Sequence, residues 1–210
     1  MSSRDRVLVV ACGALARELR HLITALDEGT AGDEAEGVGI DLECLPAKLH
    51  NRPEQIPEAV RERVRAARDR YGSILVGYAD CGTGGLLDKV CREEGVERLP
   101  GPHCYELYAG AEAFAQLQEQ ELGTLYLTDY LVRHFERLIL EGLGILDHPE
   151  LQDVYFNNYT RLVYLSQESD PELDRLAQQA ADRLGLRFEK VATGYGGLVD
   201  ALVEIRERAA

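Results

Sequence analysis

Short apolar runs alternate with amphipathic stretches through the first half of the chain. Residues 7–11 (VLVVA) form a continuous, β-branched run, which is typical of a strand buried on both faces of a parallel sheet. Residues 14–27 follow with leucine and isoleucine at helical spacing. The acidic, glycine-rich residues 29–39 predict an exposed loop. The same reasoning predicts strands at 40–45, 73–80 and 96–99, and helices at 53–71 and from the glycine turn at 81–85 to about residue 94.

The second half of the chain repeats this alternation less regularly. Residues 105–119 predict a helix, residues 129–143 a helix that is apolar on more than one side, and 149–159 a short helix rich in aromatic residues. The rest of 123–159 has no clear pattern. Asp170 and Pro171 are typical of a helix start. Further strands are predicted at 161–167 and 187–193, and the turn at 194–197 opens a last helix.

Strands that alternate with helices predict an α/β fold. We expect a mainly parallel sheet with helices on both faces, in the three layers of Rossmann-like proteins. A length of 210 residues suits one domain of ordinary size. The expectation is therefore either a single α/β domain over 1–210 or two lobes, about 1–120 and 121–210, that share one sheet of four plus two strands.

Charge and cysteine content narrow the functional classes. The formal net charge of −14 repels phosphate backbones, which argues against a nucleic-acid partner. No apolar run reaches the roughly 18 residues of a membrane span, so we expect no membrane partner. Five cysteines are an odd number, which argues against a disulfide framework and predicts a cytoplasmic protein with reduced thiols. Whether the chain forms an oligomer stays open, as does adaptation of its acidic composition to high salt.

Three cysteines follow predicted strands, where ligands bind in open α/β sheets. Cys12 follows the first strand, Cys81 the strand at 73–80, and Cys104 the strand at 96–99. They could be ordinary packing residues, or ligands of a catalytic Zn²⁺ with one open position. They could equally hold a four-iron, four-sulfur (4Fe–4S) cluster with one open iron, or Cys81 could be a nucleophile at a helix start. The simplest interpretation of Cys44 and Cys91 is that they pack as small buried residues.

Two polar residues adjoin these cysteines. His103 precedes Cys104 in a Gly-Pro-His-Cys-Tyr segment, where it could be a metal ligand, a partner of a ligand or a general base, although a lone histidine is more often structural. Asp80 precedes Cys81 and could be a ligand or a proton acceptor, or a residue that caps the turn. We treat His103 and Asp80 as the candidate catalytic residues.

Two segments could bind a small anion. Gly82, Thr83, Gly84 and Gly85 lie between a strand and a helix and can turn backbone N–H groups toward a carboxylate or phosphate, although they match neither a P-loop nor a dinucleotide fingerprint. His50 and Asn51 could contact substrate, and Arg52 could bind a carboxylate with two hydrogen bonds. The competing interpretations are a tight turn and a solvated loop.

Several unusual motifs give the chain a family resemblance. With residues 11–14 (ACGA), 49–53 (LHNRP), 80–85 (DCGTGG) and 101–106 (GPHCYE), the sequence resembles the bacterial and archaeal domain-of-unknown-function 1638 (DUF1638) family over nearly its whole length. The resemblance places Cys12, Cys81, His103 and Cys104, but not Cys91, in family motifs. It implies an association with corrinoid-dependent methyltransferases for methylated amines, and therefore a role near one-carbon transfer.

These observations lead to three functional hypotheses. The first is a metal-dependent enzyme in which Cys12, Cys81 and Cys104 hold zinc, which makes a substrate thiol a nucleophile for methyl transfer. The second is an enzyme whose iron–sulfur cluster acts through an open iron. The third is a non-catalytic ligand-binding or accessory module of a corrinoid methyltransferase system. The expected substrate is a small molecule with a thiol, amine or carboxylate, and the expected protein partner a corrinoid or methyltransferase protein.

Overall fold

The computed structural model describes residues 6–29 and 38–209. Most of the loop predicted at 29–39 therefore lies outside the described residues. The chain forms two compact units: unit 1 runs to Leu107 and resumes at Gly197, and unit 2 comprises Tyr108–Gly196. The last helix thus returns to the unit that contains the first strand, and the division falls earlier than the expected one near residue 120.

Unit 1 is built on a parallel sheet of four strands in the order β2-β1-β3-β4. Its central strand β1 is buried at every residue, as its uninterrupted apolar run predicts. The strands are β1 (Val7–Cys12), β2 (Ile40–Leu45), β3 (Ser73–Gly77) and β4 (Glu97–Arg98). The helices are α1 (Ala16–Gly29), α2 (Ile56–Ala67), α3 (Leu86–Glu94), α4 (Cys104–Ala109), which reaches the boundary with unit 2, and α9 (Leu198–Ala209).

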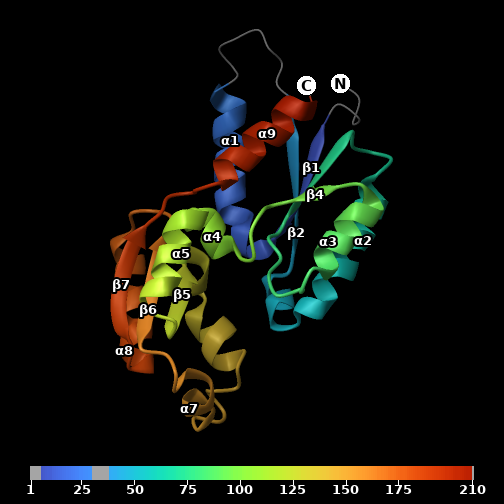
Figure 1. Ribbon diagram of the computed structural model, residues 1–210. Helices are drawn as coiled ribbons and strands as arrows, with labels where there is room; N and C mark the ends of the chain where they lie inside the picture. The colour runs from blue at the N-terminus through green and yellow to red at the C-terminus, as the bar shows by residue number, and fades with distance from the viewer. Residues whose placement is uncertain (1–5, 30–37, 210) are drawn as a thin grey trace. The chain divides into compact units, whose positions relative to one another are not determined.

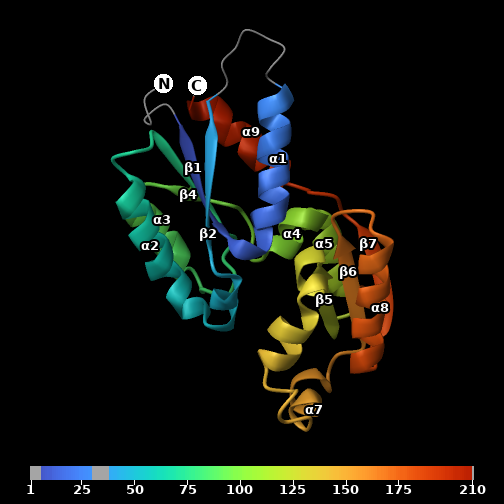
Figure 2. The same ribbon diagram turned by 180° about the vertical axis from the view of Figure 1, so that it is seen from behind.

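Helices cover both faces of this first sheet. Figures 1 and 2 show α2 and α3 on one face, and α1 and α9 on the other. Apolar residues four apart, Ile56, Val60 and Val64, are fully buried where α2 meets the sheet. The helix α3 ends at Gly95, whose φ of +63° is a conformation that glycine adopts without strain. The local sequence therefore accounts for both the face and the end of these helices.

Unit 2 has a parallel sheet of its own, in the order β5-β6-β7. Leu127, Leu162 and Tyr164 pack with the apolar face of α8, and Tyr126 contacts Phe114 of α5 with ring centroids 5.0 Å apart. The strands are β5 (Thr124–Thr128), β6 (Arg161–Ser166) and β7 (Arg187–Ala192). The helices are α5 (Ala111–Gln120), α6 (Asp129–Arg133), a π-helix (Glu136–Glu141), α7 (Leu151–Phe156) and α8 (Pro171–Leu184).

The fold class is confirmed: both sheets are parallel and flanked by helices, in a three-layer α/β arrangement. The shared sheet of four plus two strands is not what the strand pairing shows. There are two separate sheets, and β5 is a strand that the sequence pattern did not reveal. The helix expected at 129–143 is divided into α6 and the π-helix. None of the described helices combines the length and apolar character needed to cross a bilayer.

Candidate functional site

Three cysteines of unit 1 lie at the carboxyl end of its sheet, and we call Cys12, Cys81 and Cys104 the thiol edge. Cys12 is the last residue of β1, Cys81 follows β3 and Cys104 begins α4. Backbone hydrogen bonds join the turn after β3 to the turn before α4: Asp80 N–H donates to the Gly101 carbonyl (3.1 Å) and Cys81 N–H to that of Pro102 (2.8 Å). Residues far apart in sequence are thereby held at one end of the sheet.

Cys12 is the best-defined member of the thiol edge. Its side chain is buried, and its Sγ accepts a hydrogen bond from the Ala14 N–H at 3.3 Å. Both ring nitrogens of His50 are near this sulfur, Nδ1 at 3.7 Å and Nε2 at 4.0 Å. The Nδ1 atom is also 3.1 Å from the Ala47 carbonyl, which can only accept, so that bond places the ring proton on Nδ1. Desolvation of the His50 ring lowers its pKa, although the residue as a whole is exposed.

Cys81 has an unusual backbone conformation. Its φ is +51°, in the left-handed region that residues with a Cβ seldom adopt outside tight turns. Such conformations cost roughly 1–3 kcal/mol and often occur at functional sites. The sharp turn from β3 toward α3 leaves Cys81 only partly buried, at the end of the strand. A strained turn that presents a thiol favours a functional role for this residue over simple packing.

Burial raises the pKa of all three thiols. The pKa of Cys12 rises to about 12 and that of Cys81 to about 11, while that of Cys104 also rises well above its usual value. Each of these shifts comes mainly from desolvation. For Cys12 and Cys104, the negative charge of neighbouring thiolates in the thiol edge raises the pKa further. The thiols are therefore neutral at neutral pH unless a bound cation stabilises the thiolates. This disfavours Cys81 as a free thiolate nucleophile.

Two buried polar residues next to the thiol edge were not predicted from the sequence. Tyr78 is 1% exposed, its ring stacks on His50, and its hydroxyl has no partner of normal hydrogen-bond geometry among the described residues. This hydroxyl is nevertheless close enough to Cys12 to lower the pKa of the thiol in part. Glu18, buried in the first turn of α1, raises the pKa of Cys104 through its charge. In the sequence, Glu18 lies six residues after Cys12 and Tyr78 three residues before Cys81, and this proximity is the only signal for either residue.

Asp80 organises the turn between β3 and α3. Its carboxylate accepts hydrogen bonds from the Thr83 hydroxyl (2.7 Å) and from the N–H groups of Gly84 (3.1 Å) and Gly85 (2.9 Å). Although desolvation opposes it, these bonds and the charge of Arg98 lower the pKa of Asp80. Two N–H groups that were candidates for an external anion thus already bind an internal one. These contacts match the turn-capping alternative for Asp80.

The other residues that the sequence predicted to be catalytic or anion-binding have fewer contacts with the thiols. His103 is exposed, with its ring 6.0 Å from that of Tyr105. Asn51 and Arg52 are exposed, and their side chains form no hydrogen bond with the described residues. The segment nevertheless meets the glycine turn, since a Cβ added to Gly82 would be 3.6 Å from Pro53. Of the expected anion-binding segment 50–52, His50 is the residue that reaches the thiol edge.

The two remaining cysteines differ from each other. Cys91 is buried in α3, in keeping with a packing role. Cys44 was expected to be buried as well, but it is exposed in β2. The reason is its place on an edge strand, whose side chains are less covered than those of the central strand β1.

The donor atoms of the thiol edge suit a soft metal ion, but they are not gathered around one point. Three thiols and the His50 imidazole are a set that zinc prefers. Among the described residues, however, no three histidine, cysteine, aspartate or glutamate side chains are arranged as a ready-made metal site. Metal binding would therefore require side chains of the thiol edge to turn toward each other.

Comparisons with known proteins identify a family but no characterised relative. No curated protein and no solved structure matches the chain. The sequence profile of one family, described as a protein of unknown function (DUF1638), matches residues 44–202. The match includes Cys81, Cys104 and His50 and stops short of Cys12. Because it covers well over half of the 210 residues, the chain belongs to the DUF1638 family.

Proposed function

We propose that the thiol edge binds one zinc ion and that the protein is a metal-dependent enzyme acting on a small molecule. The observation that carries the proposal is the pairing of Cys12 with His50, next to two further thiols at the same end of the sheet. Bonds of about 2.3 Å to sulfur and 2.0–2.1 Å to nitrogen at a tetrahedral angle place the two ligand atoms roughly 3.6 Å apart. The available ring atom, Nε2, lies 4.0 Å from the Cys12 Sγ, slightly farther than this value.

The surroundings of His50 also suit a ligand. Metal-binding imidazoles usually donate their second N–H to a carbonyl or carboxylate, which fixes the ring. The bond from Nδ1 to the Ala47 carbonyl supplies this contact and leaves the Nε2 lone pair available. The lowered pKa keeps the imidazole neutral, as metal binding requires. Cys12, Cys81, Cys104 and His50 are therefore the proposed ligands, and a substrate atom would replace one of them or complete the site.

The remaining residues have separate roles in this proposal. When bound, zinc lowers the pKa of a substrate thiol and makes it a nucleophile for methyl transfer. The Tyr78 hydroxyl lies beside Cys12 and has no partner of normal hydrogen-bond geometry among the described residues, so it can orient a bound polar group. Asp80 fixes the turn that carries Cys81. His103, exposed next to Cys104, is the candidate proton acceptor. The family resemblance supports a corrinoid or methyltransferase protein as the partner.

Metal analysis of protein purified without oxygen tests the proposal. We expect about one zinc per chain, and a Co²⁺-substituted protein with the charge-transfer absorption of thiolate ligands. Cys12→Ser, Cys81→Ser and Cys104→Ser should each weaken zinc binding at least about tenfold. Cys44→Ser, the same exchange at an exposed cysteine of the same unit, is the matched control and should bind zinc like the unchanged protein.

Other outcomes would select a different function. Brown, iron-containing protein would replace zinc with an iron–sulfur cluster on the same three cysteines. Metal-free protein whose small-molecule binding is unaffected by the three serine variants would contradict both metal hypotheses. That result would favour a non-catalytic accessory module.

A further inference from the structure

A cavity opens in unit 1 at the end of the sheet opposite the thiol edge. Its volume is about 350 Å³, which is within the range of small-molecule sites. Ser73 and Ile74, the first residues of β3, form one wall, and Val96 and Glu97 at the start of β4 form another. Because the strands are parallel, their amino ends share this edge, and the cavity is separate from the cysteines at the carboxyl ends.

The shortness of β4 creates this cavity. β4 pairs only with Leu75 and Val76 of β3, so Ser73 and Ile74 have no strand beside them on that side. The end of α2 and the last turns of α9 enclose the resulting notch, through Arg68, Ile205 and Arg208. The notch is therefore built from regular elements of the fold and does not depend on a loop.

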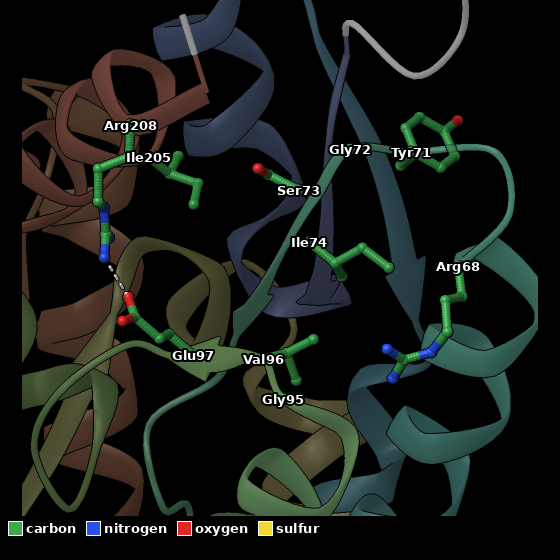
Figure 3. Close-up of a pocket in the computed structure, with 10 residues that line it drawn as sticks. All are labelled: Arg68, Tyr71, Gly72, Ser73, Ile74, Gly95, Val96, Glu97, Ile205 and Arg208. Carbon is green, nitrogen blue, oxygen red and sulfur yellow. Dashed lines mark hydrogen bonds and ion pairs between the residues drawn. The ribbon is translucent and has the colours of Figure 1, made fainter.

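The lining combines an apolar surface with two guanidinium groups. Ile74, Val96 and Ile205 supply the apolar part. Figure 3 shows the Arg68 guanidinium directed toward Ile74 and Val96, while Arg208 on the other side meets Glu97. The hydrogen bonds that Arg68 makes to described residues all leave from Nη2, and both reach Glu94.

Arg208 likewise has donor capacity to spare. It binds Glu97 through Nη1 at 2.5 Å and the Glu204 carbonyl through Nε at 3.3 Å, with Nη2 unused among the described residues. Two arginines and one glutamate give this lining a charge of +1 in a chain of net charge −14. A local positive charge next to apolar side chains is the arrangement that recognises an amphipathic anion.

We propose that this cavity is a second binding site, for a small organic anion whose carboxylate or phosphate binds Arg208 and whose apolar body lies against Ile74, Val96 and Ile205. The anion competes with Glu97 for the Arg208 guanidinium. The site shares no residue with the thiol edge, so its test is independent of the proposed metal function.

Three probes of similar shape and different charge test the chemical class. Benzoate, benzyl alcohol and benzylamine are titrated into the full chain at concentrations up to about 10 mM, and binding is followed by the backbone amide NMR shifts of Ser73, Gly95 and Val96. We expect benzoate to bind at least about tenfold more tightly than the alcohol, and the amine not to bind. Equal binding of benzoate and the alcohol, or binding of neither, overturns the proposal.

Two exposed residues at the rim give variants with opposite expected effects. Arg208→Gln should weaken benzoate binding about tenfold, whereas Glu97→Gln should strengthen it several-fold because it releases Arg208. Both side chains are at least half exposed, so neither exchange endangers folding. Arg92→Gln, on an exposed position of α3 outside the cavity, is the control. Equal affinities in the Arg208→Gln and Glu97→Gln variants would contradict the assignment of Arg208.

Discussion

The two sheets of this protein carry polar groups at the same place, the carboxyl ends of parallel strands, but they use them differently. In unit 2, Asp129 follows β5 and is 3% exposed. Its carboxylate accepts hydrogen bonds from the Tyr164 hydroxyl (2.7 Å) and from the N–H groups of Gln167 (2.9 Å) and Glu168 (3.0 Å). Gln167 in turn accepts from the Asp129 N–H at 2.8 Å. This network is complete within its own unit.

The thiol edge of unit 1 has the opposite character. Its thiols are weak hydrogen-bonding groups, burial keeps them protonated, and the neighbouring Tyr78 hydroxyl has no partner of normal geometry among the described residues. A buried polar group without a partner costs free energy, whereas a fully satisfied network stabilises a single conformation. The comparison therefore separates a carboxyl edge that serves stability from one that is available to a ligand.

The largest expected effect comes from removing the centre of the unit 2 network. Asp129→Ala leaves one hydroxyl and two backbone N–H groups buried without an acceptor, so we expect it to reduce the free energy of unfolding by about 3–5 kcal/mol. Urea unfolding measures this loss. Asp147→Ala, on an exposed aspartate of the same unit, should change stability by less than about 0.5 kcal/mol. A similar, small loss in both variants would remove the contrast between the two edges.

Much of the fold could be predicted because single elements follow local patterns. The predicted strand at 40–45 coincides with β2, and the helix start at Asp170 and Pro171 is where α8 begins. The helix expected at 105–119 is broken at Gly110, whose φ of +82° lies outside helical geometry. The separation into two sheets could not be predicted, because strand pairing depends on tertiary contacts that hydrophobic periodicity does not report.

The candidate site was predictable to the extent that topology alone places residues. Cys12, Cys81 and Cys104 could be assigned to one edge because the ends of parallel strands coincide. The contact between Cys12 and His50 could not, because it depends on how the chain turns after β2. Tyr78 was missed because a tyrosine next to a buried strand is an ordinary core residue, and only the structure shows its hydroxyl beside a thiol.

A smaller loss of stability is expected from removing Arg98, which holds the segment that precedes Cys104. Arg98 donates to the carbonyls of Leu99 (2.6 Å) and Gly101 (3.1 Å) and pairs with Asp88 at 2.7 Å. Arg98→Met should lower the free energy of unfolding by about 1–2 kcal/mol at neutral pH. The hydrogen bond from Arg98 is the main cause that lowers the pKa of Asp88 below its usual 3.8. The stabilisation from the Arg98–Asp88 pair is fully present above pH 3.8 and is lost as the pH falls through the lowered pKa of Asp88.

The difference in the free energy of unfolding between Arg98→Met and the unchanged protein should therefore become smaller in acid. Urea unfolding at neutral pH and at about pH 3 or below provides the comparison. Asp69→Asn, on an exposed aspartate that follows α2, controls for general acid effects. A difference that stays constant down to the lowest pH would show that the Asp88 pair adds nothing to the support of the thiol edge.

Matched tyrosine variants compare the two edges directly. Tyr164→Phe removes a hydroxyl that donates to Asp129, so it should cost about 1–2 kcal/mol of unfolding free energy. Tyr78→Phe removes a hydroxyl with no partner of normal geometry among the described residues. The free energy of unfolding of this variant should therefore change by no more than about 0.5 kcal/mol. Urea unfolding of both variants measures the pair. A loss in Tyr78→Phe as large as that in Tyr164→Phe would mean that the thiol edge is a finished structural network.

A small net effect on stability is also expected where the backbone of the thiol edge is strained. Cys81→Gly relieves a positive φ but loses a half-buried side chain and adds backbone freedom to the unfolded chain, so the net change should remain within about 1 kcal/mol. Cys44→Gly, in the regular strand β2, has no strain to relieve and should cost about 1 kcal/mol. The zinc affinity of the two variants should follow the opposite order. It should be at least about tenfold weaker in Cys81→Gly and unchanged in Cys44→Gly. If Cys81→Gly binds zinc normally, the strained turn serves the fold and the thiol edge loses one of its proposed ligands.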